Sequence, residues 1–345
     1  MKCPRRISLS FLVLSIWVGS TVEANDNIRL NFKIVTEIGI ESAKKQEQLP
    51  YQFSSILSAD FDSKEKIYLL DYKKTCIKVF DKTGKFLFKF LKPGQGPDEV
   101  LNPLRIKINP ITNRLYVLHQ NGFNIKEFDL NGKFVQSHPL PGQMFGDFIF
   151  LEEKRILVID DKKYGEKVGN NLKMIDLDSH RIIKELGQIK ADYFISYQTV
   201  AVLDRNIWTC PSDLMRIEAY DLISNTKIRT IDLPGPFIPF NIIRWGDRIQ
   251  KMRVYNYAQP FILGGNLFIF ITRQAFPKKV INMLDSPLKR EILIYRLNGD
   301  QLSEIHGFPS SLDFFPEILA CKGNKILISS SGYDLYPHIK VLEIQ

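Results

Sequence analysis

Five polar residues lie where strand-like segments pass into loops, and their types could bind a metal or transfer a proton. Asp71, His119 and Asp160 end three such segments, and Asp334 and His338 lie in a later loop. Histidine with carboxylates suits Zn²⁺, carboxylates alone suit Ca²⁺, and the same groups can act as general acid and base. Aspartate at such positions also commonly bonds the backbone of its own loop. The residue types therefore allow a metal-dependent hydrolase or lyase, but their positions favour a structural role in the loops.

The rest of the sequence carries no established catalytic motif. It lacks the G-x-S-x-G, H-E-x-x-H, EF-hand and C-x-x-C patterns. The segment Gly94-Gln95-Gly96-Pro97 lacks the Lys and the Ser or Thr that complete a phosphate-binding loop, and we interpret it as a turn between two units. We predict no resident cofactor, with Ca²⁺ or Zn²⁺ as the alternative that the five polar residues leave open.

The elements that must position these residues repeat along the chain. A strand-like phrase of alternating apolar residues occurs six times, and the last residues of its copies are 48, 47, 45, 75 and 47 positions apart. The copies span residues 77–81, 125–129, 172–176, 217–221, 292–296 and 339–343. A strand repeat with a period of roughly 40–50 residues is typical of small sheets in a radial array.

Each phrase is preceded by two further apolar segments rich in Ile, Leu, Val, Phe and Tyr, and in several units another segment follows it. Turns such as Asp129-Leu130-Asn131-Gly132 supply the positive φ of tight hairpins. We therefore predict an all-β fold, a six-bladed β-propeller with four antiparallel strands per blade, as one domain over residues 25–345.

The last unit ends after three strands, and one strand near the N-terminus has no unit of its own. Residues 28–38 alternate roughly as a strand does. We predict that they form the missing outer strand of the last blade, which would close the ring and cover a sheet edge.

The first unit carries a motif known from another family. Residues 84–90 are a strand-like segment that follows Val79-Phe80-Asp81, and Gly94-Gln95-Gly96-Pro97-Asp98-Glu99 comes next. This order resembles the NHL repeat; the second unit keeps its Phe-Asp-x-x-Gly part and the others only the strand pattern. Over residues 28–345 the chain is similar to six-bladed propellers of secreted bacterial proteins. NHL-type propellers include protein scaffolds, RNA binders, lyases and lactonases, so the resemblance implies a fold without choosing a function.

The N-terminus predicts a secretory signal peptide over residues 1–24. Lys2, Arg5 and Arg6 precede an apolar stretch at 7–20, and Val22-Glu23-Ala24 resembles a cleavage site. The apolar stretch is too short for a membrane anchor, and no later stretch is long enough to span a bilayer. We expect cleavage after Ala24 and a mature protein that is secreted, periplasmic or on the cell surface.

The net charge and the cysteines give weaker evidence about the environment and partners of the protein. The formal net charge is +9, or +7 after signal cleavage. Lysines occur on strands and turns of every unit without a run of five basic residues, which favours a solvated surface and disfavours nucleic acid as a partner. The mature chain would keep Cys76, Cys210 and Cys321, which we interpret as free thiols that are buried or partly buried.

Long loops are predicted on one face of the ring. The spacing between second-strand and third-strand anchors is 10 residues in three units but 16, 25 and 13 in units three, five and six. Residues 233–257, between units four and five, form a long connection that contains Phe237, Arg244 and Trp245, a composition that suits an interaction surface or burial under the loop.

The insertion of unit five, residues 272–291, contains an apolar segment at 280–284. It could be a short helix that acts as a lid over the ring opening or as a packing spacer. Loops on a rigid scaffold commonly carry function. We predict that this face binds a protein, peptide or glycan; drift in loop length and a structural module of an envelope assembly are the alternatives.

Overall fold

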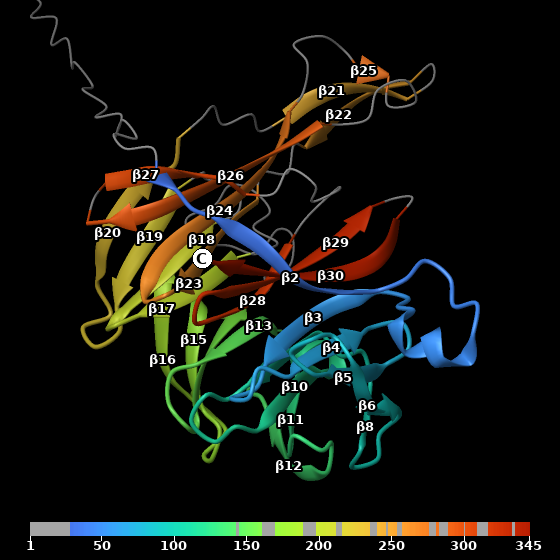
Figure 1. The fold of residues 1–345 in the computed structure, drawn as a ribbon. Helices are drawn as coiled ribbons and strands as arrows, with labels where there is room; N and C mark the ends of the chain where they lie inside the picture. The colour runs from blue at the N-terminus through green and yellow to red at the C-terminus, as the bar shows by residue number, and fades with distance from the viewer. Residues whose placement is uncertain are drawn as a thin grey trace, which may run out of the picture.

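Six blades of four antiparallel strands surround a common axis in the computed structural model, and one blade carries a short fifth strand in parallel at its outer edge (Figure 1). The residues that the structure describes are 28–142, 145–160, 170–188, 198–211, 216–234, 240–245, 248–253, 257–275, 281–282, 289–299, 301–308, 317–332 and 335–345. The prediction of a six-bladed propeller is confirmed.

Within a blade, the chain runs from the innermost to the outermost strand. The first three blades are β3 (Ile56–Phe61), β4 (Ile67–Asp71), β5 (Cys76–Phe80) and β6 (Phe86–Phe90); β9 (Arg105–Ile108), β10 (Leu115–His119), β11 (Asn124–Phe128) and β12 (Phe134–Pro139); and β13 (Phe145–Phe150), β14 (Arg155–Asp160), β15 (Asn170–Asp176) and β16 (Arg181–Gln188). The next two are β17 (Gln198–Leu203), β18 (Asn206–Pro211), β19 (Arg216–Asp221) and β20 (Lys227–Asp232); and β23 (Tyr257–Leu263), β24 (Asn266–Ala275), β26 (Lys289–Asn298) and β27 (Gln301–His306). Innermost strands of consecutive blades contact one another all the way round, so the ring is closed.

The sixth blade combines both ends of the described chain. Its strands are β28 (Glu317–Lys322), β29 (Lys325–Gly332), β30 (Leu335–Ile344) and, outermost, β2 (Phe32–Ile38). β2 runs antiparallel to β30, with Phe32 opposite Ile344 and Ile38 opposite Ile339. The predicted closure by the N-terminal strand is confirmed. The same segment also reaches the fifth blade, where β1 (Ile28–Arg29) lies parallel to β27.

The hydrophobic core lies between neighbouring blades. In β4, Ile67 and Leu69 pack toward the sixth blade, whereas Tyr68 and Leu70 pack toward the second. Because both faces of a middle strand are covered, β4 is buried along its whole length. This explains why the second strands read as continuous apolar runs.

A further sheet stands outside the blades. It consists of the hairpin β21 (Phe240–Trp245) and β22 (Arg248–Arg253) with β25 (Ile281–Asn282), in the order β22-β21-β25 (Figure 1). β21 and β22 come from the connection between blades four and five, and β25 comes from the insertion of blade five. Within the predicted helix at 280–284, the two described residues form a strand, because β21 pairs with them in parallel.

The remaining described elements are short. They are η1 (Gln46–Tyr51), η2 (Gln120–Gly122) and the parallel pair β7 (Lys92–Pro93) and β8 (Glu99–Val100). Across the described part of the chain, no helix is long and apolar enough to span a bilayer. Cys76, Cys210 and Cys321 are free thiols, as expected.

Candidate functional site

Asp71, at the end of β4, is fully buried and holds the connection that enters the first blade. Its carboxylate accepts hydrogen bonds from the backbone N–H groups of Ser54 and Ser55, each at 3.2 Å. Lys78 Nζ lies 3.8 Å from the same carboxylate and donates to the carbonyl of Gln52 at 2.7 Å. These partners occupy the carboxylate, so Asp71 supports loop backbone instead of offering an open ligand.

His119 ends β10, the corresponding strand of the second blade, and is 1% exposed. Within the described part of the chain, neither ring nitrogen has a hydrogen-bond partner. Burial, reinforced by the charge of Lys126, lowers the pKa of His119 to about 4. The imidazole is therefore neutral at neutral pH, the form that ligates metals. Asp71 lies in a different blade and shares no described partner with it.

The other predicted site residues do not complete a ligand set. His338 is buried in β30, and its Nδ1 lies 3.2 Å from the carbonyl oxygen of Tyr336. Asp160 ends β14, but its side chain lies outside the described structure, as do those of Arg244 and Trp245 in β21. Asp334 and Phe237 lie outside the described residues altogether. Among the described residues, no three His, Cys, Asp or Glu side chains form a group that could hold a metal ion.

A buried lysine recurs in the third strand of four blades. Its relative exposure is only 3–7% at Lys78, Lys126, Lys173 and Lys340. Lys126 Nζ donates to the carbonyls of Gly96 and Glu99, both at 2.6 Å, as Lys78 does to Gln52. In these two blades, hydrogen bonds from the ammonium group link the third strand to the connection from the preceding blade. The second position of the repeated phrase is the sequence signal for this role.

Charged side chains on the innermost strands form a second polar group that the sequence analysis missed. Asp60 of β3 accepts a hydrogen bond at 2.7 Å from the backbone N–H of Ile108, on the innermost strand of the next blade. Arg105 Nε lies 3.5 Å from an oxygen of Asp147 on β13. Burial raises the pKa values of Asp60 and of Glu317 on β28. The alternation of charged and apolar residues at 105–108 is the sequence signal for these positions.

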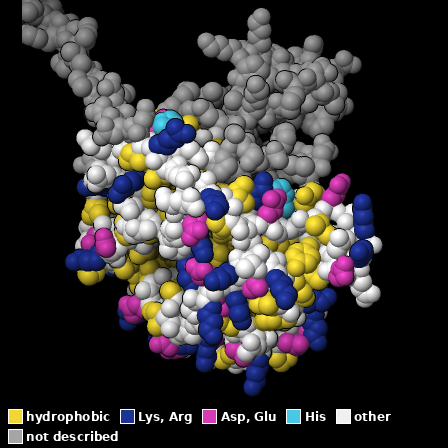
Figure 2. Space-filling model, viewed as in Figure 1, with side chains coloured by type: hydrophobic (Ala, Val, Ile, Leu, Met, Phe, Trp, Pro, Cys, Tyr) yellow, Lys and Arg dark blue, Asp and Glu magenta, His cyan; other side chains and the backbone are white. Residues whose placement is uncertain are grey.

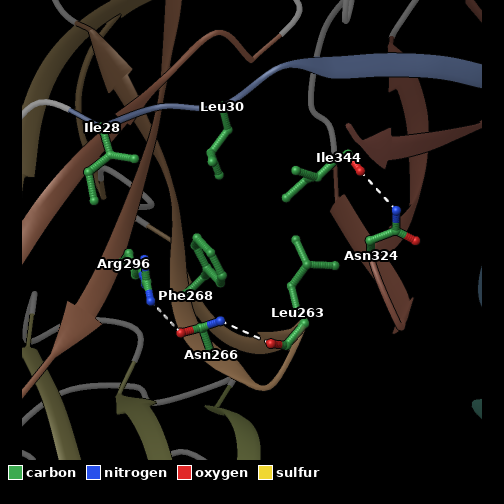
Figure 3. Close-up of a pocket in the computed structure, with 9 residues that line it drawn as sticks. Ile28, Leu30, Leu263, Asn266, Phe268, Arg296, Asn324 and Ile344 are labelled. Carbon is green, nitrogen blue, oxygen red and sulfur yellow. Dashed lines mark hydrogen bonds between the residues drawn. The ribbon is translucent and has the colours of Figure 1, made fainter.

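A small cavity lies between the described N-terminal segment and the end of β30 (Figure 3). Its volume is about 180 Å³, and apolar side chains of Ile28, Leu30, Phe268 and Ile344 line most of it. Arg296 borders it and donates a 2.6 Å hydrogen bond to Asn266. Ligand pockets commonly measure about 300–1,000 Å³. We therefore attribute this cavity to packing under the N-terminal segment.

The sheet β22-β21-β25 is the feature that best matches the predicted binding face. It joins the two longest interruptions of the repeat, residues 233–257 and 272–291. β21 and β25 pair at Ile243 opposite Ile281 and at Arg244 opposite Asn282. Two loops that the sequence presents separately are thus one composite element.

Comparison with known proteins identifies relatives by sequence and by fold. Residues 61–340 match the family described as "Domain of unknown function (DUF4934)". No curated protein matches the sequence.

Solved structures agree in fold at low sequence identity. A protein of Bacteroides fragilis NCTC 9343, described as a candidate exported protein, has a TM-score of 0.60 and 10% identity, covering 92% of this chain and 99% of that one. A DUF4221 family member from Bacteroides vulgatus gives the same TM-score, identity and coverage. Virginiamycin B lyase from Staphylococcus aureus has a TM-score of 0.50 and 13% identity, covering 91% of this chain and 100% of that one. At these identities the likeness shows the fold alone.

Proposed function

The chain belongs to the DUF4934 family, whose description states no activity, and we propose that it is an exported propeller that binds a macromolecular partner. The partner is a protein, peptide or glycan, and the contact surface is the composite sheet β22-β21-β25 with its flanking loops. The observation that carries this proposal is the pairing of β21 with β25, because it builds one continuous surface from two insertions.

A rigid ring with a projecting sheet suits a binding role. Closed propellers present loops on a fixed frame, and binding residues concentrate on such loops. The connection before β23 contributes Phe237, Arg244 and Trp245, residue types that often anchor interfaces.

Export is part of the proposal. Residues 1–24 have the composition of a signal peptide, and we place the cleavage after Ala24. The likeness to a candidate exported propeller of Bacteroides fragilis supports this location. N-terminal sequencing of the mature protein from culture fractions would test the cleavage position.

A metal-dependent hydrolase or lyase finds less support. It would use Asp71, His119 and Asp160 as a joint set. The carboxylate of Asp71 is already bonded to backbone and to Lys78, and its blade differs from that of His119. Within the described residues no suitable group of three ligands occurs.

The binding proposal is tested by capture from envelope extract. The mature protein is immobilised, bound proteins and glycans are analysed, and the double variant R244A/W245A is compared with the parent. We expect that variant to lose the captured partner while keeping its melting temperature.

The matched control is Ile223→Ala, an exposed apolar residue in the turn after β19. It should capture the partner as the parent does. Unchanged capture by R244A/W245A, or equal loss in the control, would overturn the assignment of this face.

A further inference from the structure

The two insertions that form the extra sheet carry most of the net charge of the protein. Residues 233–257 and 272–291 together contain nine Lys and Arg against three Asp and Glu, a net charge of +6. The mature chain has a net charge of +7, so the rest of the propeller has a net charge of only +1. Lysines occur in every blade, but outside the two insertions acidic residues nearly cancel their charge.

The strand pairing gathers this charge in one place. β21, β22, β25 and the outer ends of β24 and β26 contain seven cationic residues and one acidic residue, Glu291. The cations are Arg244, Arg248, Lys251, Arg253, Arg273, Lys289 and Arg290. The outer ends of β24 and β26 pair with each other, with Arg273 opposite Glu291, and β25 lies in the insertion between them.

The propeller body has a different surface. On the face shown in Figure 2, Lys and Arg side chains are interspersed with acidic and apolar ones. Several form ion pairs within the body, such as Arg114 with Glu127 at 2.6 Å and Lys325 with Glu65 at 2.8 Å. A positive charge that is unbalanced in one small sheet attracts anionic partners and repels cationic ones.

The sheet order indicates the form of the partner. β22 lies at one edge of the described sheet and pairs there with β21 alone. An edge strand can accept a further strand through its backbone groups. Arg248, Lys251 and Arg253 all lie on β22, and cations on an edge disfavour neutral or basic strands. An acidic strand relieves that repulsion.

We propose that the composite sheet recognises an acidic protein segment in extended conformation, which adds to the edge of β22. This inference rests on the proposed binding function and specifies the chemistry of the partner. Backbone pairing supplies the geometry, and the arginines and lysines select acidic side chains.

The test uses three dye-labelled peptides and fluorescence anisotropy with the full mature protein. The first peptide alternates Glu with Val and Thr, the second replaces every Glu by Lys, and the third keeps the charge of the first but carries alternate prolines. We expect binding of the first alone, with affinity that falls as salt rises. The prolines remove backbone donors and so prevent strand addition.

Charge reversal then locates the site. The variant R248E/K251E/R253E should bind the acidic peptide at least about tenfold more weakly, since close charge pairs at interfaces contribute on this scale. The control K82E/K85E/K89E makes the same change in net charge at exposed positions of the first blade, and it should bind as the parent does. The milder K251Q/R253Q serves if the triple variant does not fold.

Three results would overturn the proposal: no binding of the acidic peptide, equal binding of the proline peptide, or equal weakening by the control. If acidic peptides do not bind while R244A/W245A still abolishes capture from envelope extract, the proposed function stands and the acidic partner is wrong.

Discussion

At the scale of single residues, the buried lysines of the repeated phrase connect sequence repeat to ring assembly. Lys126 donates two 2.6 Å hydrogen bonds to the carbonyls of Gly96 and Glu99 in the connection from the first blade. Hydrogen bonds from a charged donor are stronger than neutral ones, and a buried carbonyl that loses its donor costs free energy. The lysine therefore fixes the connection in addition to filling space.

We predict that Lys126→Met lowers the free energy of unfolding by about 2 kcal/mol. Methionine matches the lysine side chain as far as Cε but lacks the ammonium group, so it cannot donate to either carbonyl. Urea unfolding measures the change, and Lys89→Met, the same substitution at an exposed position, is the control. Equal effects of the two substitutions would contradict a role for the ammonium group.

His119 makes the stability of the fold depend on pH. Its folded-state pKa of about 4 lies below the ordinary value of 6.5, so the unfolded chain takes up the proton first as the pH falls. Stability should then decrease from about pH 6.5 and level off below about pH 4, by about 3 kcal/mol in total. His119→Phe should remove this part of the decline.

The measurement is urea unfolding across this pH range, taken as the difference between parent and variant. This difference removes the contribution of Glu127 to the pH dependence, because both proteins contain it. Hydrogen bonds from His138 and Arg114 lower the pKa of Glu127, so its contribution to stability is lost only at more acidic pH. The exposed His306 gives the control, His306→Phe. An unchanged pH dependence in His119→Phe would show that the imidazole is not held neutral.

The sequence pattern located the residues that end the second strands, but it did not predict what their side chains do. Asp71 and His119 occupy the same place in neighbouring blades, yet one is bonded to loop backbone and the other has no described partner. The difference depends on the connection that each side chain meets from the preceding blade. A single unit of the repeat does not contain that connection.

At the scale of elements, the N-terminal closure could be predicted because the strand count left one gap and one unassigned strand. β2 fills the gap beside β30 and buries Phe32 and Ile38, which are 9% and 1% exposed. Without it, the outer edge of β30 would be unpaired, a state that promotes aggregation.

Deletion of residues 25–40 should therefore destabilise the whole ring. Burial of Phe32 and Ile38 alone contributes about 3–6 kcal/mol. Thermal unfolding measures the effect, with a variant that carries 32–38 after Gln345 as the control. That relocation is feasible because the backbone N–H of Gln345 already donates to Asn31 at 3.0 Å. Normal melting of the deletion variant would refute the closing role of β2.

The composite sheet shows where prediction from local pattern ends. Residues 280–284 are apolar except for Asn282 and could suit a helix or a strand. Ile281 adopts a strand because Ile243, far away in the sequence, lies opposite it. The lengths of the loops identified both insertions. The pairing between them is a long-range contact, and the local sequence of either segment does not indicate it.

At the scale of the whole molecule, we expect stability and the proposed recognition to occupy separate parts of the structure. The described core clusters lie between adjacent blades and are built from blade strands and the connections beside them. The charge is divided in the same way, since the propeller without its insertions is close to neutral. Because contacts between innermost strands already close the ring, we expect it to fold without the sheet.

Replacement of residues 235–256 by a short Gly-Ser linker tests this division. We expect one cooperative thermal transition within about 4 °C of the parent, because the core between the blades is intact. Earlier elution from a cation-exchange column should accompany it, because the segment has a net charge of +3. Capture of the envelope partner should be lost at the same time. A large fall in melting temperature would mean that the hairpin supports the ring, and the binding role would then need separate evidence.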